Sequence, residues 1–317
     1  MLLDKSPEAL NALFQSVCEN DRVTFNFPEY MAQWLFADRL RMRGDRLEMG
    51  FFAFEGTDHI RKFFAWLSQT NLADTFRPGL ADELAKISEA ADEKIFQHYG
   101  LTAQPNMLKN MGRYNAQDYI FQRAYPVPER HAIRVLMDFG AGHGRMANLG
   151  FNTPVAEDRL QTYIAVEGIP STYFTQHFYY KGLGLTVWDY FEHLDEDLSQ
   201  DTIAKAMDTH DVVHLPTWRL GLIPDGTVDM VTCVQVLKEL PGELVAHILP
   251  EFARVTKAAG AFYVRDHPQF HNPNHMPIDA LTQAQGFALE FAPQIKDRSE
   301  IHGVPRIWRK VDSALYL

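Results

Sequence analysis

One acid and three glycines stand together near the middle of the chain, at the end of an apolar run. Residues 133–139 are mostly apolar and include Asp138, and Gly140, Gly142 and Gly144 follow at once. This order predicts a buried strand, a tight turn and the start of a helix. Glycine is needed where a backbone turns sharply, takes a positive φ or lies close against a ligand. Because open α/β sheets bind nucleotide-like ligands at the carboxyl end of the first strand, we expect such a site here.

The spacing of the glycines separates two classes of cofactor. The dinucleotide fingerprint G-x-G-x-x-G has its third glycine three residues after the second, and Arg145 stands at that position here. Gly144 instead follows Gly142 by two residues. Asp138 suits a cationic ammonium group better than a phosphate. The segment resembles the S-adenosylmethionine (SAM) loop of class I methyltransferases, and an NAD-dependent oxidoreductase is the least favoured interpretation.

Three further segments resemble class I methyltransferases in the same order along the chain. The second apolar run ends in Glu167, where this fold has an acid that accepts hydrogen bonds from ribose hydroxyls. Residues 223–231 and 251–264 resemble the segments that lead into the fourth and fifth strands of the family. The four segments span residues 133–265. The resemblance implies an α/β fold with a Rossmann-like sheet, mostly parallel, whose last strand is antiparallel.

A narrower resemblance is to a family of sugar O-methyltransferases. Residues 169–173, 215–218 and 235–240 are similar to segments of that family. The family tends to have D-l-P after its second strand, where residues 167–170 carry one residue more, and Q-E-M after its fourth, where residues 238–240 read Lys-Glu-Leu. This resemblance implies that the methyl acceptor is a sugar, with a related natural-product intermediate fitting almost as well.

The resemblance also implies roles for residues around the cofactor. Asp138 is expected to face the ammonium group and Glu167 the ribose. Leu215 or Trp218 is expected to cover the adenine, with a plain core position as the alternative for Trp218. Arg113 is expected to pair with the cofactor carboxylate, and Tyr114 to close the pocket. The alternative is that this segment is a simple amphipathic helix. The predicted cofactor-binding residues are Asp138, Gly140, Ala141, Gly142, Gly144, Glu167, Gly168, Leu215, Trp218, Gln235, Arg113 and Tyr114.

Catalytic candidates follow the fourth and fifth predicted strands. A hydroxyl acceptor needs a base, and His267 is the first choice because imidazole titrates near neutral pH. Asp266 is expected to orient it or to be the base itself, unless both residues only cap a turn. Glu239 matches the glutamate of the family and is expected to hold the acceptor or the methionine end of SAM. The alternative for Glu239 is an acid favoured by the dipole in the first turn of a helix.

The segment after the fifth strand is rich in side chains that can bind metals. Asp266, His267, His271 and His275 are ligand types for zinc, iron or magnesium. Two prolines in this run prevent one regular helix from aligning the histidines. A loop that faces the substrate is therefore favoured, and we expect no metal.

Composition limits the class of protein. The chain has 317 residues, enough for one large domain or two modest ones, and a net charge of -11 that argues against general nucleic-acid binding. Its two cysteines cannot form a disulfide framework. We expect a cytoplasmic protein, because the start of the chain lacks the apolar stretch of a signal peptide and no segment is apolar enough to span a bilayer.

Apolar periodicity suggests two parts. Helices are predicted at residues 7–17, 28–42, 57–67 and 78–99. Residues 1–125 are therefore expected to form an all-helical domain that acts as a lid, in substrate recognition or in dimerisation. Residues 126–317 alternate short apolar strands with helices, as a parallel sheet requires. Phe63, Phe64 and Trp66 are candidates either for a homodimer contact or for packing on the sheet domain.

We expect an enzyme that moves a methyl group from SAM to a hydroxyl of a small molecule. The alternatives are methylation of nitrogen or carbon, a SAM enzyme that transfers no methyl group, and a SAM-binding regulatory or scaffolding subunit.

Overall fold

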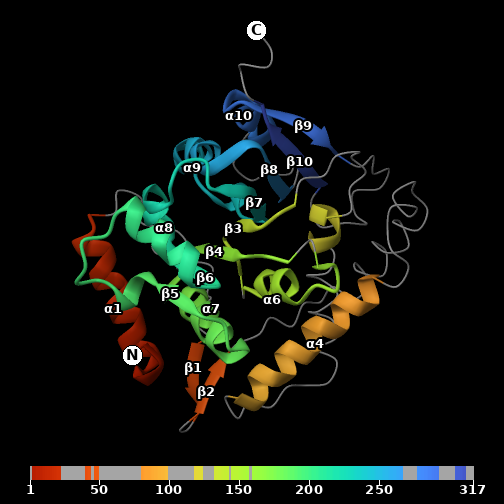
Figure 1. Ribbon diagram of the computed structural model, residues 1–317. Helices are drawn as coiled ribbons and strands as arrows, with labels where there is room; N and C mark the ends of the chain where they lie inside the picture. Colours follow the sequence, from red (N-terminus) through yellow and green to blue (C-terminus); the bar gives the residue numbers. More distant parts are fainter. Residues whose placement is uncertain are drawn as a thin grey trace.

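The computed structural model describes residues 2–22, 40–43, 46–49, 80–98, 118–123, 132–142, 144–156, 159–266, 277–292 and 304–311. Its main sheet consists of β3 (Val135–Phe139), β4 (Thr162–Glu167), β5 (Val187–Asp189), β6 (Val212–Pro216), β7 (Val228–Val234), β8 (Thr256–Asp266), β9 (Phe287–Phe291) and β10 (Val304–Lys310). The eight strands lie in the order β5-β6-β4-β3-β7-β8-β10-β9 (Figure 1). All neighbours are parallel except the two pairs that contain β10. The expected Rossmann-like sheet with a reversed last strand is confirmed.

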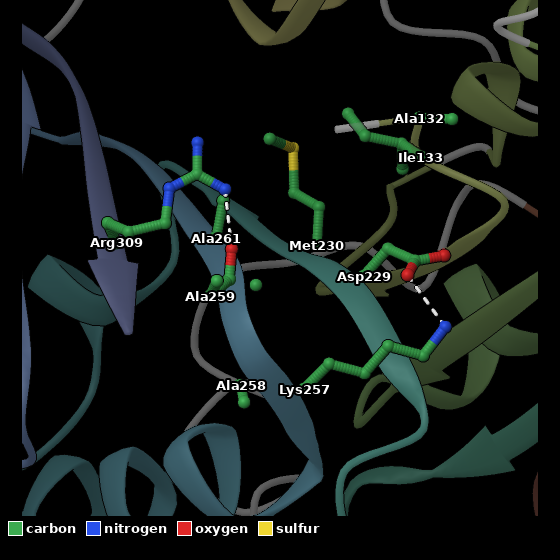
Figure 2. Close-up of a pocket in the computed structure, with 10 residues that line it drawn as sticks. Ala132, Ile133, Asp229, Met230, Lys257, Ala258, Ala259, Ala261 and Arg309 are labelled. Atoms are coloured by element: carbon green, nitrogen blue, oxygen red, sulfur yellow. Dashed lines mark hydrogen bonds and ion pairs between the residues drawn. The ribbon is translucent and has the colours of Figure 1, made fainter. Parts of the chain in front are cut away.

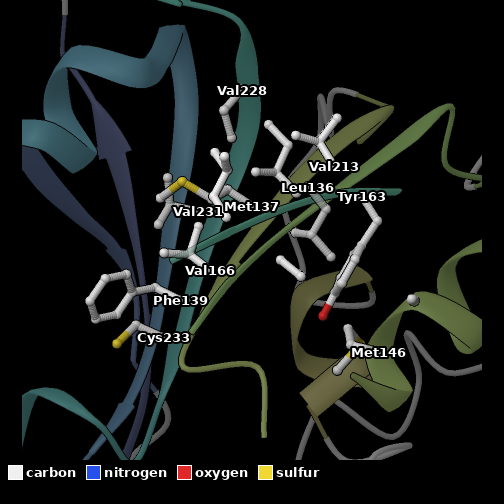
Figure 3. Packing of buried hydrophobic residues seen from close by; sticks show 14 of the residues in the cluster. Leu136, Met137, Phe139, Met146, Tyr163, Val166, Val213, Val228, Val231 and Cys233 are labelled. Carbon is white, nitrogen blue, oxygen red and sulfur yellow. The ribbon is translucent and has the colours of Figure 1, made fainter. Parts of the chain in front are cut away.

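The centre of this sheet is covered on both faces. Strands β4 and β6 are buried at every position, as expected for parallel strands with helices on either side. Met137 of β3 pairs with Ile164 of β4 and with Val231 of β7. Figure 3 shows the side chains of these neighbouring strands packed together in the core. The apolar runs of the sequence thus become the strands that position the polar residues at their ends.

Described helices begin at residues 7 and 80, close to the predicted ranges 7–17 and 78–99; the predicted helix over 57–67, with Phe63, Phe64 and Trp66, lies outside the described residues. The helices of the whole described chain are α1 (Pro7–Asn20), α4 (Leu80–His98), α6 (Arg145–Asn152), α7 (Pro170–Leu183), α8 (Gln200–Thr209), α9 (Gly242–Val255) and α10 (Ile278–Ala284), with short 3₁₀ turns η1 (Leu2–Asp4), η5 (Tyr190–Glu192), η6 (Thr217–Leu222) and η7 (Leu237–Glu239). The predicted start of α1 is confirmed, since the Ser6 hydroxyl accepts a hydrogen bond from the Ala9 amide at 3.2 Å. Helix α1 packs on α7, and α4 runs beside α6 and α7 (Figure 1).

The first part of the chain contains a hairpin that the helical pattern did not predict. Strands β1 (Leu40–Arg43) and β2 (Arg46–Met49) pair antiparallel, with Arg43 opposite Arg46. The helix expected over residues 28–42 is therefore wrong at its end. The sequence does carry the signal, because apolar and charged residues alternate on both sides of Gly-Asp, a pattern typical of a two-residue hairpin.

In the part of the chain that the structure describes, no helix combines the length and apolar character needed to cross a bilayer.

An ion pair attaches residues 118–123, which are helical, to the sheet. The Asp118 carboxylate accepts hydrogen bonds from Arg265 Nε at 2.7 Å and from a second guanidinium nitrogen of Arg265 at 2.9 Å. The Tyr263 hydroxyl donates to the same carboxylate at 2.6 Å. Arg265 is fully buried and Asp118 is 3% exposed, so neither charge is solvated by water.

Replacing Asp118 tests the strength of this attachment. In Asp118→Asn the buried Arg265 loses its counter-charge, and we expect the free energy of unfolding to fall by about 3 kcal/mol. The matched control is Asp225→Asn, which breaks the ion pair with Arg254 where the aspartate is 70% exposed. That change should cost less than about 1 kcal/mol. Urea unfolding followed by circular dichroism measures both, and equal losses would contradict the prediction.

Candidate functional site

The glycine turn after β3 requires its glycines for conformational reasons. Gly140, Gly142 and Gly144 have φ values of 71°, 58° and 74°, in the left-handed region that other residues rarely adopt. A Cβ on Gly140 would collide with Val236, and one on Gly144 with the Tyr180 hydroxyl. A Cβ on Gly142 would meet no described atom within 4 Å. The turn is therefore closely packed at both ends and open at its middle, where a ligand can approach the backbone.

Asp138 lies beneath this turn and is nearly buried. It is 7% exposed, and its Oδ2 accepts a hydrogen bond from the Tyr163 hydroxyl at 2.6 Å. Burial raises the pKa of Asp138 to about 7; the hydrogen bond from Tyr163 opposes the shift, and the charges of Asp118 and Glu167 add to it. A nearby cation would stabilise its charged form. This carboxylate is thus suited to receive an ammonium group.

Glu167 ends the neighbouring strand β4 and is held in one orientation. Its Oε1 accepts hydrogen bonds from the amides of Gly168 at 2.8 Å and Ile169 at 3.0 Å. Its Oε2 accepts one from Gln176 Nε2 at 3.1 Å. Since β3 and β4 are parallel neighbours, the predicted acid and the glycine turn lie at the same edge of the sheet. A fixed carboxylate at this place can accept hydrogen bonds from sugar hydroxyls.

Two residues predicted for the adenine occupy different environments. Leu215 is fully buried within β6. Trp218 packs edge-on against Phe14 of α1, with ring centroids 5.2 Å apart, and its indole N–H donates to Asp21 at 2.7 Å. These contacts favour the packing alternative for Trp218.

The turn after β7 brings together three other predicted residues. Gln235 has a φ of 62°, and its backbone amide donates to the Arg265 carbonyl at 2.9 Å. The fully buried Asp266 accepts a hydrogen bond from the Lys238 amide at 3.0 Å. Glu239 ends η7, partly buried. The Asp266 carboxylate thus helps to fix the turn after β7, and its roles as base, as partner of His267 or as cap of the turn after β8 stay predictions.

Several predicted residues cannot be placed. Arg113, Tyr114, His267, His271 and His275 lie outside the described residues. Their roles as lid, base or metal ligands stay predictions.

A cluster that the sequence did not predict lies behind Glu167. Gln176 and His177 of α7, Asp189 at the end of β5 and His214 of β6 are all fully buried. Both histidines place Nδ1 near Asp189 Oδ2, at 2.7 and 2.8 Å. The sequence carries one signal of this cluster, because His214 stands within an otherwise apolar run. Its partners, however, are 25 or more positions away in the sequence.

Ligand atoms of His177, Asp189 and His214 lie within 4.8 Å of one another, so the set has the composition of a metal site. Ligands of a tetrahedral zinc ion are about 3.3 Å apart, however, and the N–O separations of 2.7 and 2.8 Å are those of charge-assisted hydrogen bonds.

A clear hollow in the described surface lies at the other end of the strands. It has a volume of about 300 Å³ and lies between the start of β7 and residues 257–261 of β8 (Figure 2). Lys257 Nζ pairs with Asp229 at 2.6 Å, and Arg309 donates to the Ala259 carbonyl at 2.7 Å. Open α/β sheets bind ligands at the carboxyl ends of their strands, so this hollow is not our candidate.

Comparisons with known proteins give distant likenesses. No family model and no curated protein sequence matches the chain. A chain from the complex between the Haloferax volcanii Trm112 methyltransferase activator and a methyltransferase is similar over 71% of this chain and 98% of its own, with 14% identity and a TM-score of 0.42. Magnesium protoporphyrin IX methyltransferase from Synechocystis PCC 6803 with bound SAM is similar over 75% and 99%, with 14% identity and a TM-score of 0.37. At this distance the residues of the chain itself must support any function.

The glycine turn yields a prediction about stability. Gly142→Ala should cost about 1 kcal/mol, because only the left-handed conformation opposes it. Gly140→Ala adds the collision with Val236 and should cost about 2–4 kcal/mol. Urea unfolding of the two variants measures the difference, and a larger loss for Gly142→Ala would show that the turn is packed otherwise.

Proposed function

We propose that the chain is a SAM-dependent methyltransferase. The observation that carries this proposal is the meeting of the left-handed glycine turn with Asp138 and Glu167 at the carboxyl ends of adjacent parallel strands. Asp138 would hold the ammonium group of SAM and Glu167 its ribose hydroxyls, while Gly142 lets the cofactor approach the backbone. A dinucleotide fits less well, because Arg145 replaces the third glycine and its buried guanidinium lies over the Tyr179 ring at 5.8 Å.

The reaction that we propose is O-methylation of a small molecule, a sugar or a natural-product intermediate. SAM supplies a methyl group bonded to a sulfonium. The acceptor oxygen forms the new bond to carbon as the carbon–sulfur bond breaks, and the electron pair of that bond stays on sulfur in S-adenosylhomocysteine. His267 would take the hydroxyl proton, with Asp266 as the alternative base, and Glu239 would hold the acceptor or the methionine end of SAM. The main demand on the protein is alignment of the two reactants.

Two further parts of the proposal concern the role of residues 1–125 and the location of the protein in the cell. We propose that this part acts as a lid with Arg113 and Tyr114, recognises the acceptor or mediates a homodimer, and that the protein works in the cytoplasm. The alternatives are N- or C-methylation, a non-methylating SAM enzyme and a SAM-binding regulatory subunit. Release of S-adenosylhomocysteine with hydroxylated acceptors distinguishes methylation from the last two.

Binding of S-adenosylhomocysteine should depend on pH through Asp138. Its carboxyl is charged above a pKa of about 7, and only the charged form attracts an ammonium group. The affinity measured by calorimetry between pH 5.5 and 8.5 should therefore rise by up to about tenfold per unit below pH 7 and level off above it.

Two controls accompany this measurement. Asp138→Asn should bind more weakly and lose the rise near pH 7. NAD⁺ should give no heat at concentrations that saturate the wild type with S-adenosylhomocysteine. Binding of NAD⁺ alone would overturn the proposed function.

The base is tested by turnover. His267→Ala should lower methyl transfer about 10²–10⁴-fold, with the affinity for S-adenosylhomocysteine changed less than about twofold. Mass spectrometry of the methylated acceptor measures transfer, and Asp266→Asn is the comparison that separates the two candidate bases. Full activity of His267→Ala would remove this residue from the mechanism.

A further inference from the structure

Gln176 joins the two halves of the candidate cofactor site. Its Nε2 donates to the Gly142 carbonyl at 2.8 Å and to Glu167 Oε2 at 3.1 Å. One contact is on the glycine turn and the other on the acid at the end of β4. The side chain belongs to α7 and is fully buried. A single amide therefore sets the position of the turn relative to the carboxylate.

The direction of this amide follows from its partners. An amide NH₂ has two hydrogens, and both partners of Nε2 accept, so the nitrogen must face the turn and Glu167. Gln176 Oε1 then faces His214 Nε2 at 3.0 Å. If the amide were reversed, its oxygen would face two acceptors. His214 Nε2 must therefore carry a proton and donate it to Gln176.

His214 is itself held from its other side. Its Nδ1 is 2.8 Å from Asp189 Oδ2, and Asp189 Oδ1 accepts hydrogen bonds from the Phe191 amide at 2.9 Å and the Tyr173 hydroxyl at 3.0 Å. The Tyr173 ring stacks on the imidazole with centroids 3.7 Å apart. These contacts allow the imidazole no other orientation without loss of a buried hydrogen bond.

The charges of this pair follow from the same contacts. Burial opposes the charged form of Asp189, but the charges and hydrogen bonds of His177 and His214 outweigh it and hold the pKa of that carboxyl well below its usual value. Burial lowers the pKa of His214, and Asp189 works against that shift. Acceptors nevertheless face both ring nitrogens, so the hydrogen bonds favour a proton on each against the effect of burial, as an imidazolium that Asp189 neutralises.

We propose that Gln176 is a positioning residue for the cofactor, and that His214, by donating from Nε2, fixes the direction of its amide. This inference rests on the proposed function, because it assigns Gln176 to the alignment of the turn and the ribose-binding acid. Neither residue needs to touch the methyl group. Their effect is expected in the affinity for the adenosyl part of the ligand.

The test uses S-adenosylhomocysteine as the probe, titrated by calorimetry into the full-length protein. Gln176→Leu removes the hydrogen bonds and should weaken binding about tenfold or more. Glu167→Gln should also weaken binding. If Gln176 acts through Glu167, the fold-loss of affinity in the double variant should be much smaller than the product of the fold-losses in the two single variants. Gln176→Asn serves as a second variant if the leucine variant does not fold.

A matched pair at position 214 separates positioning from packing. His214→Gln carries an amide nitrogen at the depth of Nε2 and can still donate to Gln176. His214→Asn carries its amide at the depth of Nδ1 and cannot. Both lose the ring that stacks on Tyr173, so thermal unfolding should be similar, whereas binding should weaken only in His214→Asn.

The outcomes separate this inference from the proposed function. Absence of binding by the wild type would overturn both. If the wild type binds and Gln176→Leu binds within twofold of it, or if His214→Gln loses as much affinity as His214→Asn, this inference alone fails. One metal ion per wild-type chain by elemental mass spectrometry, lost in Asp189→Asn, would assign the cluster to a metal and overturn the proton arrangement.

Discussion

The position of Gly140 is the constraint on which the rest of the site depends. Its amide donates to the Val166 carbonyl at 2.8 Å, and Val236 occupies the space where a side chain would be. The turn is therefore held between β4 and the segment that follows β7. The parallel pairing of β3 with β4 places Asp138 and Glu167 at one edge of the sheet, and the left-handed conformation at Gly140 lets the backbone turn there.

The sequence was sufficient for the features that depend on local chemistry. The mostly apolar run of residues 228–234 forms β7, as expected of a central parallel strand that is buried on both faces. Glycines and acids at strand ends predicted the edge of the sheet that carries the site. Strand β5 was not predicted, because its three residues, Val-Trp-Asp, are too few to show a periodic pattern of apolar positions.

Contacts between distant segments could not be predicted in the same way. Gln176 and His214 are 38 positions apart, and neither has a neighbour in the sequence that points to the other. The contact exists only because α7 packs across β4 and β6. Trp218 shows the same limit, since its indole partner, Asp21, is 197 positions away at the end of α1. The sequence around Trp218 was therefore compatible both with packing in the core and with stacking on the adenine base, because it does not reveal where α1 lies.

The buried polar groups behind Glu167 are costly to maintain. Removing a charged or strongly polar side chain from water costs several kcal/mol, and apolar residues of similar volume often give an equally stable or more stable core. The cost is offset here by nearly complete hydrogen bonding, because Asp189 accepts from four donors. Apolar packing could fill this space, but it could not fix the rotation of an amide at Gln176. A network with one permitted arrangement of donors and acceptors can do so, since each reversal leaves a buried acceptor facing another acceptor. The polar composition of this part of the core is thus explained by orientation rather than by stability.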